Sequence, residues 1–268
     1  MKFLAFNNGY CVSDIKYVNK KLKSKKIKFP ATFFYLEIEG IKLLFDTGYS
    51  KSLSNSSNIF EKLYSILTKV FCIKDADEVL LENNINPNEI QYIIMSHFHP
   101  DHYGSLNKFP NATIICSNEA SKLLASSDIN KIRNLVLKNL IPNDVEKRIL
   151  KIENFTKEEM YENRFYNILN LNEIYAFHLE GHAIGHIGIY LKTLRKLIIF
   201  DAVWSKDNLE GMQPSKLVKN MVSHSVKEYD KSINKINDLI SLLEEDVKDK
   251  IEIIIAHDEK FLRSPYEF

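Results

Sequence analysis

Residues 95–103, MSHFHPDHY, place three histidines and an aspartate within six positions: His97, His99, Asp101 and His102. The chain holds only eight histidines in 268 residues, so this density is unusual. Imidazole nitrogens and a carboxylate suit Zn²⁺, with Mn²⁺ or Fe as alternatives. A closed structural zinc site usually relies on cysteine, which this stretch lacks. The cluster therefore indicates a metal site that takes part in catalysis.

Four ligands in one loop cannot complete two metal shells, and three further candidates occur later in the chain. His182 lies in the glycine-rich segment EGHAIGHIGIY, Asp201 directly follows the apolar run IIF, and His257 directly follows IIIA. His186 shares the segment of His182, but we interpret it as packing beneath the turn. His178 and His224 are isolated and are interpreted as surface or core histidines. The candidate ligands are therefore seven.

The elements that must hold these ligands are predicted from periodicity and turn residues. Each candidate ligand lies just past a predicted strand or beside a glycine turn, where a rigid sheet can hold a loop site. We expect strands at 90–95, 112–117, 174–179, 187–192, 196–200 and 251–256, a hairpin over 31–48 turning at Glu39-Gly40, and helices within 54–70, 76–85, 227–247 and from Asn118. Strands and helices alternate in both halves, which predicts an α/β layered fold. No repeat or linker is present, so residues 1–268 are expected to form a single domain.

The bulk composition excludes several classes of partner. Lys and Arg number 36 and Asp and Glu 35, which gives no electrostatic reason to expect nucleic acid. The basic run KKLKSKK at 20–26 is interpreted as a solvated loop, with a phosphate- or lipid-binding patch as the less favoured alternative. Cys11, Cys72 and Cys116 lie far apart without a C-x-x-C pair, which fits a reducing cytoplasm. No signal-peptide or membrane-spanning pattern is found, so no membrane partner is expected.

Taken together, these elements resemble the metallo-β-lactamase superfamily. The resemblance spans about residues 31–260. It implies an αββα four-layer sandwich with two metal ions in a groove at one edge of the sheets. The motifs that carry it are H-x-H-x-D-H as His97, His99, Asp101 and His102, then Gly181-His182, Asp201 and His257, with an upstream D-T-G turn as Asp46-Thr47-Gly48.

The resemblance also implies a role for each residue. His97, His99 and His182 would bind the first metal, Asp101, His102 and His257 the second, and Asp201 would bridge them. Two cations about 3.5–4 Å apart can lower the pKa of a shared water toward about 7, so that a metal-bridging hydroxide attacks a carbonyl carbon. Asp101 is also expected to orient this nucleophile. Asp46 is expected to accept a proton from a ligand imidazole and fix its tautomer.

Within the superfamily, the chain is similar to the N-acyl-homoserine lactone hydrolases. That branch follows its bridging aspartate with alanine, as in Asp201-Ala202, and ends in G-H-D-x-E, here with Ala256 in place of the glycine. Trp204 stands where these lactonases usually carry a tyrosine that contacts the substrate carbonyl. It is therefore a candidate catalytic residue, with core packing as the alternative. The expected function is metal-dependent hydrolysis of a carboxylic ester or lactone.

Other functions remain open on the sequence alone. A thioesterase of the glyoxalase II type would need a basic pocket for glutathione carboxylates, and a phosphodiesterase could use the same pair of metals. A binding or sensory module without turnover is the rival from another class. We expect a small-molecule substrate, two divalent ions that are most simply zinc, and no organic cofactor. The oligomeric state is open, with a homodimer among the options.

The segment near 119–170 is predicted to be a mainly helical insertion and is a candidate cover for the active site. Four of its aromatic residues are expected to form an apolar wall for an acyl chain: Phe155, Tyr161, Phe165 and Tyr166.

Overall fold

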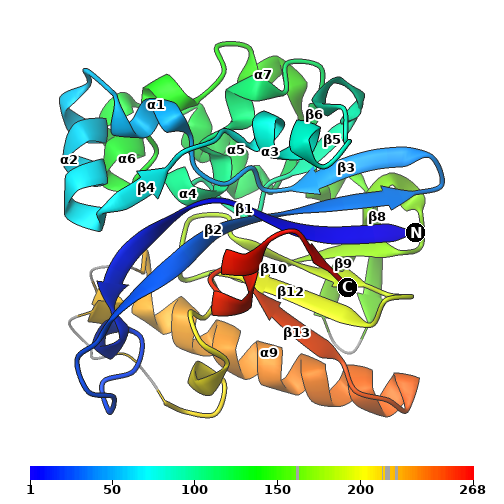
Figure 1. Ribbon diagram of the computed structural model, residues 1–268. Helices are drawn as coiled ribbons and strands as arrows, with labels where there is room; N and C mark the ends of the chain where they lie inside the picture. Colours follow the sequence, from blue (N-terminus) through cyan, green and yellow to red (C-terminus); the bar gives the residue numbers. More distant parts are fainter. Residues whose placement is uncertain (161–162, 213, 215–217, 221–222) are drawn as a thin grey trace.

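The computed structural model describes residues 1–160, 163–212, 214, 218–220 and 223–268. Over these residues two β-sheets pack face to face, and helices cover both outer faces (Figure 1). The first sheet has the order β14-β1-β2-β3-β5-β6-β7, with β4 paired to β1, and the second has the order β13-β12-β11-β10-β9-β8. This arrangement of layers confirms the predicted αββα sandwich.

The strands of the first sheet are β1 (Lys2–Asp14), β2 (Lys26–Ile38), β3 (Ile41–Phe45), β4 (Val70–Cys72), β5 (Tyr92–Ile94), β6 (Thr113–Cys116), β7 (Ile149–Lys151) and β14 (Tyr266–Glu267). Those of the second are β8 (Thr156–Met160), β9 (Asn163–Asn167), β10 (Ile174–His178), β11 (Ile187–Leu191), β12 (Lys196–Phe200) and β13 (Glu252–Ile255). The α-helices are α1 (Lys51–Ser54), α2 (Ile59–Thr68), α3 (Ala76–Glu82), α4 (Pro100–Tyr103), α5 (Asn118–Leu124), α6 (Asp128–Arg133), α7 (Val145–Arg148) and α9 (Val226–Val247). Short 3₁₀ turns are η1 (Ile15–Tyr17), η2 (Pro87–Glu89), η3 (Leu106–Lys108), η4 (Lys138–Leu140), η5 (Ile152–Asn154), η6 (Ile168–Asn170), η7 (Lys206–Asn208) and η8 (Glu259–Arg263).

Three buried clusters fill the spaces between the four layers. In β2, Phe33 and Tyr35 face the helices α1–α7, whereas Phe34 and Leu36 face the second sheet. This alternation follows from the two-residue period of a strand, and here both faces are buried because both sheets are covered. The outer face of the second sheet packs on α9. The apolar residues of α9 recur at helical spacing as Tyr229, Ile233, Ile236, Leu239 and Leu243.

Local turn chemistry explains the ends of these elements. The β2–β3 hairpin turns at Glu39 and Gly40, whose φ angles of 51° and 78° are those of the tight turn that matches the twist of a hairpin. Helix α9 begins where the Ser225 hydroxyl accepts a hydrogen bond from the backbone N–H of Glu228. The predicted hairpin and the predicted long helix are both confirmed.

The prediction that residues 119–170 are mainly helical is wrong for the second half of the segment. Helices α5 and α6 occupy its start, but β7 joins the edge of the first sheet and β8 and β9 form a hairpin on the second. These strands are only three to five residues long and β8 is mostly polar, and their identity depends on pairing with other strands, so local periodicity could not reveal them.

No helix among the described residues is long and apolar enough to cross a membrane.

Candidate metal centre

Two strands of each sheet end at one common edge and position the candidate ligands. In the first sheet β3 and β5 run parallel, so their carboxyl ends lie side by side, with Phe45 opposite Ile94. The residues that follow, Asp46 and the loop holding His97, are joined by a hydrogen bond from the Asp46 backbone N–H to the Ile94 carbonyl, 3.1 Å long. The sheet therefore fixes the spacing between the D-T-G turn and the histidine cluster.

The one-turn helix α4 divides the H-x-H-x-D-H motif into two halves. His99 is its N-cap and Pro100 its first residue, and the His102 backbone N–H donates to the His99 carbonyl at 2.9 Å. His97 and His99 consequently project from the extended loop, while Asp101 and His102 project from the first helical turn. This is the change of direction after Pro100 that the sequence predicts.

The second sheet supplies three more side chains. His182 follows Gly181, whose φ is 121°; a Cβ there would lie 2.1 Å from the Tyr229 backbone nitrogen, so only glycine lets the loop approach α9 this closely. Asp201 follows β12, whose last residue, Phe200, has a φ of 47°, an uncommon value that turns the chain sharply at the strand end. His257 lies two residues past β13, which runs parallel to β12.

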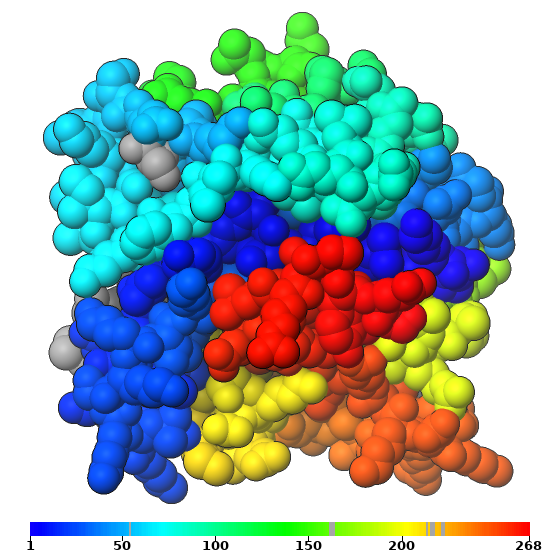
Figure 2. Space-filling model, in the orientation of Figure 1, coloured from blue at the N-terminus to red at the C-terminus, as the bar shows by residue number. Residues whose placement is uncertain are grey.

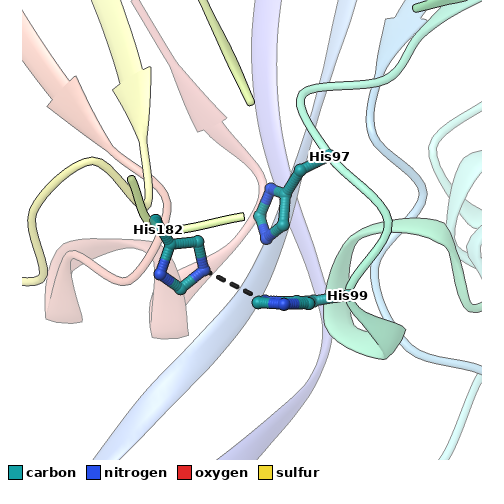
Figure 3. A group of neighbouring side chains, drawn as sticks. All are labelled: His97, His99 and His182. Atoms are coloured by element: carbon teal, nitrogen blue, oxygen red, sulfur yellow. Dashed lines mark hydrogen bonds between the residues drawn. The ribbon is translucent and has the colours of Figure 1, made fainter. Parts of the chain in front are cut away.

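His97, His99 and His182 form the first group (Figure 3). One nitrogen from each ring lies within 4.8 Å of the others. Nε2 of His182 is 3.0 Å from Nδ1 of His99, and the His97 ring stands nearly perpendicular to both neighbouring rings. Three imidazole nitrogens thus converge on one small volume.

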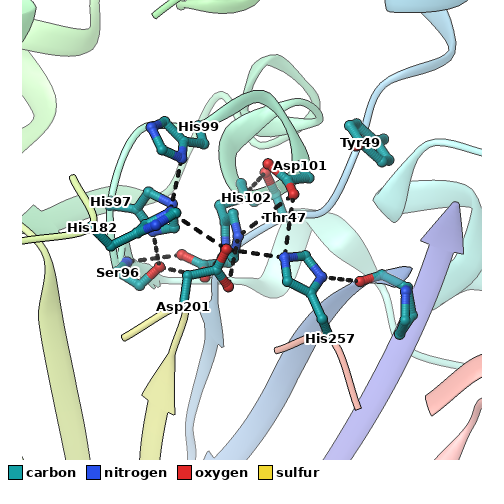
Figure 4. Close-up of polar contacts among 12 residues, drawn as sticks. Thr47, Tyr49, Ser96, His97, His99, Asp101, His102, His182, Asp201 and His257 are labelled. Carbon is teal, nitrogen blue, oxygen red and sulfur yellow. Dashed lines mark hydrogen bonds and ion pairs between the residues drawn. The ribbon is translucent and has the colours of Figure 1, made fainter. Parts of the chain in front are cut away.

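Asp101, His102, Asp201 and His257 form the second group (Figure 4). Asp201 Oδ2 lies 2.9 Å from His257 Nε2 and 3.5 Å from His182 Nε2, and its Oδ1 lies 3.3 Å from His102 Nε2. Asp201 therefore contacts ligand candidates of both groups. All seven residues singled out in the sequence are brought together.

Buried polar atoms without partners show that these residues fit a cation. His97 Nε2 is fully buried and has no hydrogen-bond partner among the described residues, and the buried atoms His102 Nε2 and Asp201 Oδ1 have only each other within reach, 3.3 Å apart. Native proteins rarely leave such atoms unsatisfied, and a bound metal ion would satisfy them. A donor set of five imidazoles and two carboxylates matches divalent transition metals.

The electrostatics of the two groups differ. Burial, together with neighbouring imidazoles, holds the pKa of His97 and of His182 well below the usual value, and burial lowers the pKa of His99 to about 4. These rings are neutral near pH 7 and offer lone pairs. Burial also opposes charge on His102, but the carboxylates of Asp201, Asp101 and Asp46 raise its pKa well above the usual value. The second group therefore concentrates negative charge that would attract a cation.

Asp46 and Ser96 orient the rings of His102 and His97 through contacts with the Nδ1 atom of each ring. Asp46 Oδ2 accepts hydrogen bonds from His102 Nδ1 at 2.8 Å and from the Ser96 hydroxyl at 2.7 Å, and Oδ1 accepts from the Ser96 backbone N–H. The Ser96 oxygen lies 3.0 Å from His97 Nδ1. The predicted contact of Asp46 with a ligand imidazole is thus present, whereas Ser96 was not predicted. The Pro30 carbonyl, which accepts a hydrogen bond from His257 Nδ1 at 2.7 Å, was also missed because nothing local marks it.

A cavity of about 400 Å³ opens above both groups. His99, Asp101 and His257 are among the residues at its floor, and Tyr64, Leu135 and other residues from distant segments form its walls. Its volume is that of a site for a small molecule. Among the described residues that line it there is no lysine or arginine.

Trp204 lies in the wall of this cavity, with its ring perpendicular to that of His182 at 5.8 Å and stacked on Tyr229 at 6.0 Å. Its position is therefore beside the candidate ligands. His186 belongs to neither group: it is buried, and its Nδ1 donates to the Leu179 carbonyl at 2.8 Å.

The predicted aromatic wall is wrong for the three residues that the structure describes. Phe165 packs between the second sheet and α9, and Tyr166 and Phe155 pack between the two sheets, while Tyr161 lies outside the described residues. For Phe165 and Tyr166 the reason is that β9 pairs into the second sheet, so its side chains become core, and Phe155, just before β8, packs against the core between the sheets. The earlier part of the same segment does reach the site, because Leu123, Arg133 and Leu135 line a second cavity of about 280 Å³ beside His99 and His182.

Comparison with known proteins agrees with the fold and with the candidate metal site. Residues 28–126 match the metallo-beta-lactamase superfamily. An N-acyl homoserine lactonase of Bacillus cereus is 26% identical over 213 residues, which cover 77% of each chain. One of Bacillus thuringiensis is 25% identical over 218 residues, again covering 77% of each.

Solved structures share the fold over nearly the whole chain. An N-acyl homoserine lactone hydrolase, solved with the product N-hexanoyl-L-homoserine at its catalytic metal center, superposes with a TM-score of 0.74 at 22% identity. The match covers 100% of this chain and 97% of that one. A probable metal-dependent hydrolase from Staphylococcus aureus gives a TM-score of 0.71 at 16% identity, covering 96% and 89%.

Proposed function

Since the chain belongs to the metallo-β-lactamase superfamily of metal-dependent hydrolases, we propose that it hydrolyses a lactone, and specifically the ring of an N-acylated homoserine lactone. The observation that carries the proposal is the position of Asp201, which contacts both ligand groups beneath a cavity with a largely uncharged wall. The lactonase relatives supply the substrate class.

The proposed centre holds two divalent ions, most simply zinc. His97, His99 and His182 would hold one ion, Asp101, His102 and His257 would hold the other, and Asp201, which contacts both groups, would be shared between them. Bound there, such ions would acidify a water molecule and polarise the substrate carbonyl.

The chain's own residues would position the reactants and move the proton. Water adds to the lactone carbonyl carbon and loses one proton, the ring C–O bond breaks, and the departing alkoxide takes up that proton to give a hydroxycarboxylic acid. Asp101 faces the cavity with Oδ2 3.6 Å from His257 Nε2, where its carboxylate can accept a hydrogen bond from the attacking water and hold it in place. Trp204 closes the side of the cavity next to His182 and offers an indole N–H.

The cavity wall favours this function over its rivals. A glyoxalase II-like thioesterase needs cationic side chains for glutathione carboxylates, and a phosphodiesterase binds an anionic substrate. The described lining carries neither lysine nor arginine but includes Phe29, Leu135 and Val218. An apolar wall suits an acyl chain. We also propose that the residues around Arg133–Leu135 cover the site, since Arg133 and Leu135 line the second cavity and Leu135 lines the first one as well.

The test is a hydrolysis panel of N-hexanoyl homoserine lactone, the ring without its acyl chain, a glutathione thioester and a phosphodiester. We expect kcat/KM for the acylated lactone to exceed every other value by at least about 100-fold, because both the ring and the chain are bound. Equal or faster cleavage of the thioester or the phosphodiester would assign the site to that class instead.

The same panel tests Trp204 with a matched pair of variants. If its N–H donates to the substrate, Trp204→Phe lowers kcat/KM about tenfold and Trp204→Tyr restores most of it, since only tyrosine keeps a donor. Identical values for the two variants would show that Trp204 contributes only to the wall.

A further inference from the structure

Helix α2 turns its apolar side toward solvent. Ile59, Phe60, Leu63, Ile66 and Leu67 are between 48 and 71% exposed, and at about 100° per residue they share one face of the helix. Phe71 of β4, which is 49% exposed, continues this face. We call these six residues the apolar stripe. Amphipathic helices of globular proteins usually bury such a face, so this stripe calls for a partner.

Exposed large hydrophobic residues are concentrated in this segment rather than scattered singly over the surface. Of the fourteen large hydrophobic residues exposed in the described part of the chain, seven lie between 59 and 73. The opposite side of α2 faces the protein: Glu61 is buried there, and Tyr64 and Thr68 line the cavity above the two ligand groups, which we call the central cavity.

A group of lysines that have no acidic partner among the described residues lies beside the stripe. Residues 16–28 contain seven exposed lysines, and Lys62 and Lys69 of the α2–β4 segment bring the number to nine. None of the nine forms an ion pair with an acidic side chain within the described ranges. They are Lys16, Lys20, Lys21, Lys23, Lys25, Lys26, Lys28, Lys62 and Lys69, and we call them the lysine rim.

Strand pairing joins the stripe and the rim into one surface. β1 pairs with β4 on one side and with β2 on the other, so Tyr10 stacks on Phe71 at 5.1 Å and carries the Lys28 ammonium 4.2 Å above its ring. Contact with Lys26 lowers the pKa of Lys69, which indicates that positive groups are crowded together. Figure 2 shows the two segments, cyan and blue, along the same left-hand edge of the molecule.

Charge decides which partner this surface fits. A second copy of the chain would bring another nine lysines against these nine, and like charges in contact disfavour association. An anionic bilayer satisfies both features, since apolar side chains enter the boundary of the acyl chains while lysine ammonium groups remain among the phosphates.

We propose that the apolar stripe and the lysine rim dock this protein on the surface of an anionic lipid bilayer. The basic run at 20–26 on its own favoured a solvated loop and no membrane partner; the exposed stripe beside it, which appears only in the fold, changes that interpretation. Tyr17 of η1 and Tyr64 and Thr68 of α2 line the central cavity, so docking places the cavity mouth close to the lipid. This last consequence, access for a substrate with an acyl chain, rests on the proposed function, whereas the docking does not.

The test is co-sedimentation of the full chain with vesicles of phosphatidylcholine alone and of equal parts phosphatidylcholine and phosphatidylglycerol. We expect binding to the mixed vesicles that weakens as salt is added, and little binding to phosphatidylcholine. The double variant Leu63→Ser/Leu67→Ser should bind at least about tenfold more weakly. Ile129→Ser, which alters an equally exposed apolar residue on α6, should not change binding.

The lysines are tested separately. Lys21→Gln/Lys23→Gln should weaken binding about fivefold for each charge removed, whereas Lys227→Gln/Lys250→Gln, the same change on or just past α9, should have no effect. Binding that ignores lipid charge, or that survives the stripe substitution, would overturn the proposal. A chain that sediments with neither vesicle would also overturn it. If the stripe substitution instead converts a dimer to a monomer, the stripe is an interface with a second copy of the chain. Because binding is measured without turnover, failure here leaves the proposed hydrolysis untouched.

Discussion

Replacing Asp201 with alanine is expected to lower lactone hydrolysis by at least about 1,000-fold and to reduce the bound metal. Asp201 is the side chain that contacts both ligand groups, with His257 at 2.9 Å, His102 at 3.3 Å and His182 at 3.5 Å. Burial opposes its charge, but His257 and His102 hold the pKa of Asp201 well below the usual value, so it is a carboxylate throughout the neutral range. Alanine would remove both the proposed bridging ligand and a full negative charge.

The loss should appear in two measurements made on the same samples, kcat for N-hexanoyl homoserine lactone and metal content by plasma emission. Asp238→Ala is the matched control, because Asp238 is an exposed aspartate on α9 away from the centre. An Asp201→Ala protein that keeps its metal and hydrolyses within about tenfold of the wild type would refute the bridging role.

Asp46→Asn is expected to weaken metal binding about 10- to 100-fold while the chain still folds. The Asp46 carboxylate accepts hydrogen bonds from His102 Nδ1, the Ser96 backbone N–H and the Ser96 hydroxyl. Asparagine tolerates the φ of 60° at this position. Its amide NH₂ group, however, would replace one accepting oxygen and face the hydrogen-bond donors of Ser96 or His102. The His102 ring, and through Ser96 the His97 ring, would lose their fixed orientation.

A zinc competition titration measures this loss, with thermal unfolding as a second readout. Asp75→Asn is the control, since Asp75 is equally buried but caps α3 and pairs with Lys108 away from the centre. We expect Asp75→Asn to change stability alone and Asp46→Asn to change metal affinity as well. Equal metal affinity in the two variants would mean that Asp46 does not orient the ligands.

The candidate ligands could be predicted from the sequence because their signals are local. His97, His99, Asp101 and His102 lie in one short motif, and Asp201 and His257 each follow an apolar strand. The strand ends then had to meet at one edge, which the layered architecture ensures. What remained hidden depends on partners far away in the chain: Ser96 contacts Asp46, and the Pro30 carbonyl contacts His257 across 227 positions.

The fold was predictable where apolar runs are long and failed where strands are polar or interrupted. β12 and β13 are almost wholly apolar and were predicted. β8, with the sequence TKEEM, is a strand only because it pairs with β9. β1 was overlooked because Asn7, Asn8 and Gly9 interrupt its pattern; the register with β2 shifts there, and a Cβ on Gly9 would lie 2.7 Å from the Phe71 carbonyl oxygen of β4.

Titration of metal-free protein with Zn²⁺ during lactone hydrolysis tests the central claim most directly. The two groups of converging ligands predict no turnover without metal and a rise that reaches its plateau at about two equivalents per chain. Full activity in the metal-free protein, or no activity with any amount of Zn²⁺, Mn²⁺ or Fe²⁺, would contradict it.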